Sequence, residues 1–348
     1  MLLLAVFVLP NVIVRPPQQL SSLPASDRVQ SLLSLAQTRN AVRTSLIQAV
    51  GGALVLLTLA ASIGQLLVAR QGQLVDRFTK TIDQLGNDSV DVQLGGVFAL
   101  QQIARRPDYA RPAAEILRAY LKIHASDPAS TTQASVVGTE HSPGDGARGA
   151  AVRLRPNLQA ALRILVKDGL WDKSAMGVLD LSFIDVQVAD LAGADLSAVV
   201  LLGARLQGSN LRNCRLNGAD LRQASLDRAD LRGADLSGAD GTRASLKEAN
   251  LDKAKLTAAT FEAADLSNAT MLRAGLQDTD FTDATLSGVK AGGSTLIRTV
   301  LIGTNLDKID LADSTLRDIR FDPVSSPVGA NLTGALTDED TMSWLSGS

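Results

Sequence analysis

Few side chains in this sequence belong to the types that move protons, attack electrophiles or hold metals. The 348-residue chain contains two histidines, His124 and His141, and one cysteine, Cys214. A single cysteine cannot build a disulfide framework or a multi-cysteine metal site within one chain. We expect His124 at the end of a helix and His141 in a linker, where a histidine is most often simply solvated. The sequence therefore predicts no catalytic residue and no metal site.

The glycine pairs do not form phosphate-binding loops. Gly51–Gly52 lies in an apolar stretch, and Gly95–Gly96 is not followed by Lys and Ser or Thr. A phosphate-cradling loop needs both features, a flexible turn and the lysine that reaches the phosphates. We therefore predict no cofactor and no cofactor-binding residue, and we predict that the protein is not an enzyme.

Aspartate is abundant, but it follows a repeat. From Leu181 to Phe321 every fifth residue is a repeat centre, which gives 29 centres: 22 Leu, three Phe, Val186, Met271, Gly241 and Ala291. The residue two positions before a centre is small, most often Ala, and the residue between them is commonly Asp or Asn. Because the repeat itself demands these aspartates, their pairing is no evidence for acid–base chemistry.

A period of five fits neither an α-helix nor a β-strand, so the chain must turn after each short extended piece to keep the leucines inward. Units of the form Ala-Asp/Asn-Leu-x-x, such as Ala219-Asp220-Leu221, resemble those of the pentapeptide repeat proteins. The resemblance implies an all-β solenoid, a right-handed quadrilateral β-helix with four pentapeptides per coil. At four per coil, 29 units give a little over seven coils, roughly 35 Å at a spacing of about 4.8 Å.

Four repeats per coil place residues 20 apart in one column. The column through Leu181 then contains Gly241, Phe261, Phe281 and Phe321. A glycine centre leaves a void that a neighbouring ring could fill to restore packing density. We predict that Phe261 packs over Gly241 and stacks on Phe281; the alternative is a local bulge at the glycine.

The N-terminal part predicts a membrane-associated region over residues 1–70. Leu46–Val68 is 23 residues without a charge, which is long enough to cross a bilayer, and the alternative is a buried soluble helix. Arg15–Ser45 is expected to be a loop that turns helical towards Arg43. Met1–Val14 has three interpretations, a weak signal peptide, an interfacial segment or the tail of a transmembrane helix, and the lack of a basic flank favours the third.

The remaining domains follow from changes in composition and period. We expect a helical HEAT-like module at 71–125, a flexible linker at 126–152, a capping helix at 153–170, the β-helix at 171–321 and a C-terminal cap at 322–348 that breaks the register. The module, with Arg77-Phe78-Thr79-Lys80 and Leu94-Gly95-Gly96, resembles the juxtamembrane region of actinobacterial membrane-anchored pentapeptide repeat proteins.

Charge is nearly balanced, with Lys plus Arg 34 against Asp plus Glu 36. The repeats mix both signs, which is a poor copy of a DNA duplex and also a poor nucleic-acid-binding surface. We therefore predict a bacterial membrane-anchored scaffold that presents the repeats to an unknown protein partner, without direct nucleic-acid binding. Arg39 and Arg43 before the span, against Arg70, Arg77 and Lys80 after it, favour a cytoplasmic soluble part. The resemblance to the pentapeptide repeat proteins implies an alternative function, a DNA mimic that modulates a type II topoisomerase.

Overall fold

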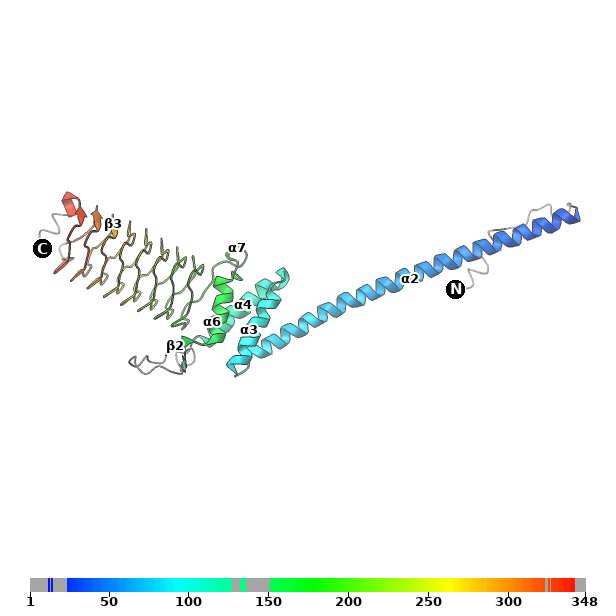
Figure 1. Cartoon of the computed structure of the whole chain (residues 1–348), viewed down its shortest axis with the longest axis horizontal. Coiled ribbons are helices and arrows are strands. Elements are labelled where there is room, and N and C mark those ends of the chain that lie inside the picture. The colour runs from blue at the N-terminus through cyan, green and yellow to red at the C-terminus, as the bar shows by residue number, and fades with distance from the viewer. Residues whose placement is uncertain are drawn as a thin grey trace, which may run out of the picture. The chain divides into compact units, whose positions relative to one another are not determined.

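The computed structural model describes residues 12, 14, 24–126, 132–135, 151–322, 325 and 327–341. The chain divides into two compact units, Met1–Arg77 and Phe78–Ser348. Helix α2 (Ala25–Leu85) runs through the boundary between them, and the second unit holds the other helices and the stacked coils (Figure 1).

Helix α2 begins earlier than the sequence predicts. We expect a loop over Arg15–Ser45 because of three prolines, yet the helix starts at Ala25, directly after the last of them, Pro24. No proline occurs from Ala25 to Leu85, so no ring clash or missing N–H interrupts the helix. The loop expectation is therefore wrong from Ala25 up to the region of Arg43, where the sequence predicts that the chain turns helical. Residues 15–23 lie outside the described residues, as does Met1–Val14 except for Val12 and Val14.

One stretch of α2, Asp27–Ser62, is long and apolar enough to cross a membrane by length and composition. Within this stretch an 18-residue segment has a mean hydropathy of 1.8, and none of that segment is buried. This is the one such stretch among the residues that the structure describes.

Two further helices, α3 (Val90–Ala104) and α4 (Pro107–His124), pack against each other. Pro107 is the first residue of α4. A backbone N–H at this position would have no acceptor within the helix, so the lack of an N–H in proline costs no hydrogen bond. Buried apolar side chains from both helices form the core of this module, including Val97, Leu100, Leu117 and Leu121.

The linker expected at 126–152 is partly ordered. Strand β1 (Thr132–Ser135) pairs antiparallel with β2 (Ala151–Leu154), so the two ends of this region are joined by backbone hydrogen bonds. That pairing corrects the expectation of a continuous flexible linker. Residues 136–150 lie outside the described residues.

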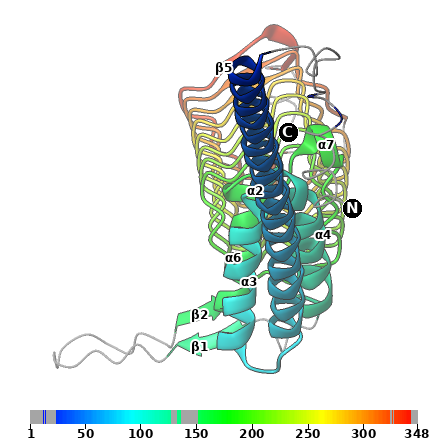
Figure 2. The same cartoon turned by 90° about the vertical axis from the view of Figure 1, so that its right-hand side faces the viewer.

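Three short helical pieces follow β2 and lead into the coils. Helix α6 (Pro156–Leu162) continues as the π-helical turn η2 (Arg163–Lys167), and α7 (Lys173–Met176) comes next. The Gln159 side chain binds the backbone of Asp190, donating to its carbonyl and accepting from its N–H. Figure 2 shows α3, α4 and α6 across this end of the coils. The hydrophobic core is continuous from the helices into the coils.

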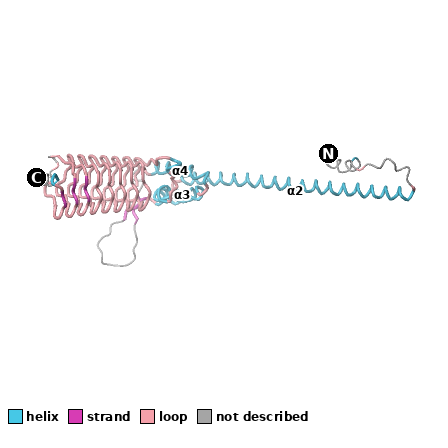
Figure 3. Tube along the Cα trace, turned by 90° about the horizontal axis from the view of Figure 1, so that it is seen from above, coloured by secondary structure: helices cyan, strands magenta, loops and turns pink. Residues whose placement is uncertain are grey.

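The repeats fold into stacked, four-sided coils (Figure 3). Parallel bridges join residues 20 apart, from Asp180 with Val200 to Val300 with Arg320, which confirms four pentapeptides per coil. Within a pentapeptide the bridging residue is followed by the centre and by two turn residues, the second of which has a positive φ. Nineteen non-glycine residues adopt this left-handed conformation at φ 53–61°. The last coils contain the parallel sheet of β3 (Thr295–Ile297), β4 (Thr315–Arg317) and β5 (Leu336–Thr337).

The interior of the coils is apolar. Repeat centres and the small residues two positions before them are almost fully buried, as at Leu236 and Ala234, both 0% exposed. The predicted aromatic packing is confirmed. The Phe261 and Phe281 rings stack with centroids 5.9 Å apart at 20°. A Cβ built on Gly241 would lie 2.4 Å from Phe261 Cε1, so the ring occupies the space that the missing side chain leaves.

The C-terminal region does not simply break the register. Asp310 bridges to Asn331, 21 residues later, so one extra residue is accommodated between Asp322 and Val328. Ala330-Asn331-Leu332 then resumes the repeat pattern, and β5 pairs with β4. The expectation of a cap outside the register at 322–348 is therefore corrected: part of this region forms a further partial coil.

Candidate functional site

The residues with catalytic potential are not brought together. The His124 ring packs on Tyr120 with centroids 4.4 Å apart, and burial, with the positive charge of Arg155, lowers the pKa of His124. Cys214 lies in the interior of the coils, where burial raises the pKa of its thiol to about 11. A thiol held protonated in this way is a poor nucleophile. His141 lies outside the described residues, and no metal-binding group of three or more His, Cys, Asp or Glu occurs in the part that the structure describes.

The functional surface of the coils is therefore made of outward-facing side chains. Each pentapeptide presents three positions: the bridging residue, the first turn residue and the second turn residue. Because consecutive coils stack in register, each position forms a row of residues 20 apart along the β-helix. A molecule that binds this surface would contact side chains of several neighbouring rows at once, as on other solenoids.

Many aspartates at the bridging position have a structural task. Asp240 Oδ1 accepts hydrogen bonds from the N–H and the hydroxyl of Thr242, two residues later, and Asp280 holds Thr282 in the same way. Such an acceptor satisfies a turn N–H that the neighbouring coils leave unpaired. This explains why Asp and Asn are frequent immediately before a centre.

Two aspartates also tie the helices to the first coils. Partial burial opposes ionisation of Asp180, but hydrogen bonds from Ser182 and Lys122 outweigh it and lower the Asp180 pKa to about 2. Burial likewise opposes ionisation of Asp195, and hydrogen bonds from Lys173 and Ser197 lower its pKa to about 2. The two lysines belong to α4 and α7, so these ion pairs join helix to coil.

Opposite charges are paired along the outside of the coils. Arg228 Nε lies 2.8 Å from Glu248 Oε2, and Arg298 Nη2 lies 2.6 Å from Asp278 Oδ2, in each case across one coil spacing. Arg222 pairs with Asp220, 2.7 Å away, within one pentapeptide. The net charge of the surface is therefore close to zero at each of these ion pairs.

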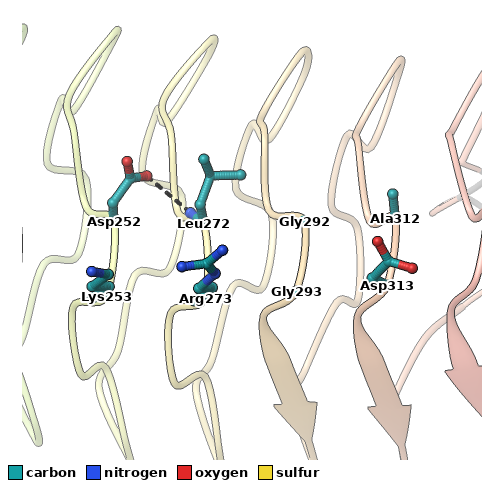
Figure 4. Close-up of a pocket in the computed structure, with 8 residues that line it drawn as sticks. All are labelled: Asp252, Lys253, Leu272, Arg273, Gly292, Gly293, Ala312 and Asp313. Atoms are coloured by element: carbon teal, nitrogen blue, oxygen red, sulfur yellow. Dashed lines mark hydrogen bonds between the residues drawn. The ribbon is translucent and has the colours of Figure 1, made fainter.

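A depression interrupts this surface near Gly292 and Gly293. It has a volume of about 470 Å³ and is lined by the turn residues of four successive coils, 252–253, 272–273, 292–293 and 312–313. Both turn residues of the third coil are glycines, so two outward side chains are missing from the ladder (Figure 4). We call this depression the Gly-Gly notch.

A second depression of about 350 Å³ lies between α3 and α6–η2. Phe98 is 49% exposed at its edge, and Gln101 donates to the Asp168 carboxylate across it. Sequence reasoning identified neither depression as a site. The available signal for the notch was a pair of glycines at both turn positions of one pentapeptide.

A family model for pentapeptide repeats matches the chain with eight copies, over residues 189–226, 224–262, 244–283 and 279–318. A pentapeptide repeat protein of the Arabidopsis thaliana thylakoid lumen is 38% identical, with 30% of this chain and 67% of that chain covered and a TM-score of 0.21. The chain belongs to the pentapeptide repeat family. The repeats of this family imply a right-handed quadrilateral β-helix, and the four-sided coils form it.

Other solved pentapeptide repeat proteins are similar. HetL of the cyanobacterium Nostoc, involved in the regulation of heterocyst differentiation, is 25% identical over 47% of this chain and 91% of that chain, with a TM-score of 0.29. QnrB1, a plasmid-mediated fluoroquinolone resistance protein, is 19% identical over 49% of this chain and 86% of that chain, with a TM-score of 0.29. A comparison with curated proteins finds no match.

Proposed function

We propose that this pentapeptide repeat protein is a membrane-anchored scaffold: α2 holds it in the cell membrane, and the outward rows of its coils bind a protein partner in the cytoplasm. It performs no catalysis. The predicted membrane span, 46–68, lies within α2.

The observation that carries the anchor is the exposure of apolar side chains on α2. Leu54, Val55, Leu56 and Leu57 are 57–68% exposed. Such a continuous apolar surface is unfavourable in water and matches the hydrocarbon of a bilayer. At 1.5 Å per residue, 61 residues reach about 90 Å, so a bilayer core of about 30 Å takes up one third of α2.

Two hydroxyl side chains of the span donate hydrogen bonds to backbone carbonyls of the same helix. The Thr58 hydroxyl donates to the Leu54 carbonyl at 2.5 Å, and the Ser62 hydroxyl donates to the Thr58 carbonyl at 2.8 Å. In hydrocarbon each unpaired polar group costs several kcal/mol, so hydroxyls that bond back to the helix are suited to a lipid-facing position.

The charge pattern argues against the alternative, a DNA mimic acting on a type II topoisomerase. Such a mimic needs an uninterrupted acidic face to copy a duplex with one charge per about 1.7 Å. On this protein Arg228, Arg222 and Arg298 neutralise acidic groups along the coils. If the full chain altered supercoiling by gyrase at micromolar concentration, the mimic would replace the scaffold.

Alkaline carbonate extraction of membranes tests the anchor. The full chain should remain in the pellet. Leu56→Arg with Leu57→Arg places two charges mid-span, at about 3 kcal/mol each, and should release the protein or prevent its insertion. The matched control, Leu32→Arg with Leu33→Arg, lies in α2 outside 46–68 and should stay membrane-bound. Extraction of the unchanged chain by carbonate would contradict the anchor.

A further inference from the structure

The outer face of α3 is exposed along its whole length. Residues that follow one another at spacings of four and three lie on one side of a helix. On this side all five residues are exposed: Asp91, Gly95, Phe98, Gln102 and Arg105. The Phe98 side chain is 49% exposed, and a Cβ built on Gly95 would meet nothing within 4 Å beyond its own helix, so the surface beside the ring is open. We call these five residues the α3 stripe.

The two ends of the α3 stripe carry opposite charges. Asp91 lies in the first turn of α3, and Arg105 directly follows the last turn, still in helical conformation. Asp88 and Arg106, which flank the stripe, repeat these signs, and α3 has no charged residue between Asp91 and Arg105. None of these four side chains has an ion pair among the described residues, although Asp108 stands only three residues after Arg105. The stripe is therefore acidic at its start, apolar in the middle and basic at its end.

This order of charges makes the α3 stripe complementary to itself. Phe98 is the midpoint, seven residues from Asp91 and seven from Arg105. A second copy related by a two-fold axis at Phe98 runs antiparallel, so the acidic start of each stripe faces the basic end of the other. Antiparallel helices also bring opposite ends of their dipoles together. A parallel arrangement would instead place like charges side by side, so the pattern specifies an antiparallel pair.

The second depression lies next to the centre of the stripe. Phe98 stands at its edge, and Ala160 and Ile164 belong to its lining. Figure 2 shows α3 and α6 next to each other at this place. The two charged residues of the lining cancel, because Arg163 Nε lies 3.6 Å from Asp168 Oδ1. A ring from a second copy can therefore cover the apolar lining without burying an unpaired charge.

We propose that the α3 stripe binds the same stripe of a second copy of this chain, antiparallel about a two-fold axis at Phe98. The two Phe98 rings pack together beside the second depressions, and Asp91 of each copy pairs with Arg105 of the other. This contact goes beyond the proposed scaffold function and does not depend on the membrane anchor. For a scaffold its consequence is bivalency: a pair carries two sets of coils, so a partner with two binding segments is held more tightly than by one copy.

Sedimentation velocity of the full chain in a mild detergent, over a range of concentrations, tests the self-association. A contact made mainly by one helix from each copy is smaller than a standard interface of about 1,600 Å², so we expect a dimer with a dissociation constant of roughly 10 µM. A chain that remains monomeric at about tenfold higher concentration would overturn the proposal and leave the stripe to a different protein.

Phe98→Glu locates the contact. It places two like charges at the two-fold axis and should weaken the dimer at least about tenfold. The matched control is Phe183→Glu on the first coil: Phe183 is 64% exposed, and its second turn position already holds Glu at residue 248. The control should dimerise like the unchanged chain, and thermal unfolding checks that both variants keep the fold. An unchanged dimer in Phe98→Glu, or an equal loss in the two variants, would overturn the α3 stripe as the contact.

A charge swap tests the antiparallel arrangement independently. Asp91→Arg and Arg105→Asp each bring like charges together and should weaken the dimer about fivefold, as expected for exposed ion pairs. The double variant restores opposite charges across the axis and should dimerise like the unchanged chain. The stability of α3 changes in the other direction, because both substitutions oppose the helix dipole and the double variant opposes it most. A double variant that dimerises no better than the single variants would overturn the antiparallel pair.

Discussion

At the scale of single residues, stability depends on which side of the coil a residue faces. Centres such as Leu236 are fully buried, whereas first turn residues such as Arg232 stand in solvent and pair locally, here with Asp230. With a period of five and four units per coil, the position of a residue within its pentapeptide is enough to tell whether its side chain faces inward or outward.

Leu236→Asp should therefore unfold the coil around it. It buries a charge without a partner, a change that typically costs more than 4 kcal/mol. Arg232→Ser should leave the unfolding temperature nearly unchanged. Thermal unfolding followed by circular dichroism compares the two, and an equal loss in both variants would contradict the assignment of inward and outward positions.

The Gly241–Phe261 pair permits a double-mutant cycle. Gly241→Leu alone places a side chain where the Phe261 ring lies and should cost about 1–3 kcal/mol by overpacking. Phe261→Leu alone leaves a cavity and should cost about 1–2 kcal/mol. Combining them restores two leucine centres, so the double variant should be more stable than the sum of the single losses implies. Additive losses in denaturant unfolding would show that the ring does not fill the glycine's space.

At the scale of elements, the helices that precede the coils protect their first edge. An open end of a β-helix exposes unpaired strand groups. Here the Asp185 N–H donates to the Ala125 carbonyl at the end of α4, and Lys122 binds both Asp180 and Ser182. The helical module and the first coil are thus joined by backbone and side-chain contacts.

Asp180→Asn tests this junction through its pH dependence. Because the folded-state pKa of Asp180 is lowered from 3.8 to about 2, its charge stabilises the fold above pH 3.8, and this contribution is lost as the pH falls through 2. The pair is half exposed, so solvent limits its worth to about 1 kcal/mol. Asp180→Asn should lower the unfolding temperature at pH 7, and this effect should be much smaller at pH 2, where about half of the Asp180 carboxyl groups are protonated in the folded state.

The matched control for this prediction is Asp280→Asn. Asp280 holds Thr282 as Asp180 holds Ser182, but it has no lysine partner among the described residues. It should show a smaller loss at pH 7. Equal losses at Asp180 and Asp280 would mean that the turn hydrogen bonds, and not Lys122, account for the effect.

At the scale of the whole molecule, the proposed membrane anchor makes a prediction about the side of the membrane on which the coils lie. Arg39 and Arg43 before the span and three basic residues after it favour the cytoplasm. Cys214 is buried, so no thiol is exposed among the described residues. Labelling of a single introduced cysteine therefore shows on which side of the membrane that residue lies.

Ala263→Cys places a thiol at an exposed second turn position. In intact cells a membrane-impermeant maleimide should fail to label it, and labelling should appear after lysis. The unchanged chain, with Cys214 alone, should remain unlabelled in both conditions because its thiol is buried and its pKa is raised to about 11. Labelling of Ala263→Cys in intact cells would place the coils outside.

The sequence by itself determined the repeating part of this protein. The inward centres follow from the fixed period of five. The four-unit coil follows from the resemblance to the pentapeptide repeat proteins, and the stacking of Phe261 on Phe281 follows from four units per coil, because each repeat contacts only the coils before and after it. The same reasoning predicts helices where the apolar spacing is strong, as in α3 and α4.

Tertiary structure decided the features that depend on several coils or on elements far apart in sequence. The Gly-Gly notch exists because turn residues 20 apart, from 252 to 313, stand side by side. The Lys122–Asp180 contact joins residues 58 apart, and the pairing of β1 with β2 depends on how both ends of a long segment meet. The backbone pairing of Asp310 with Asn331, 21 residues later, shows that the repeat resumes at Asn331 with its register shifted by one residue.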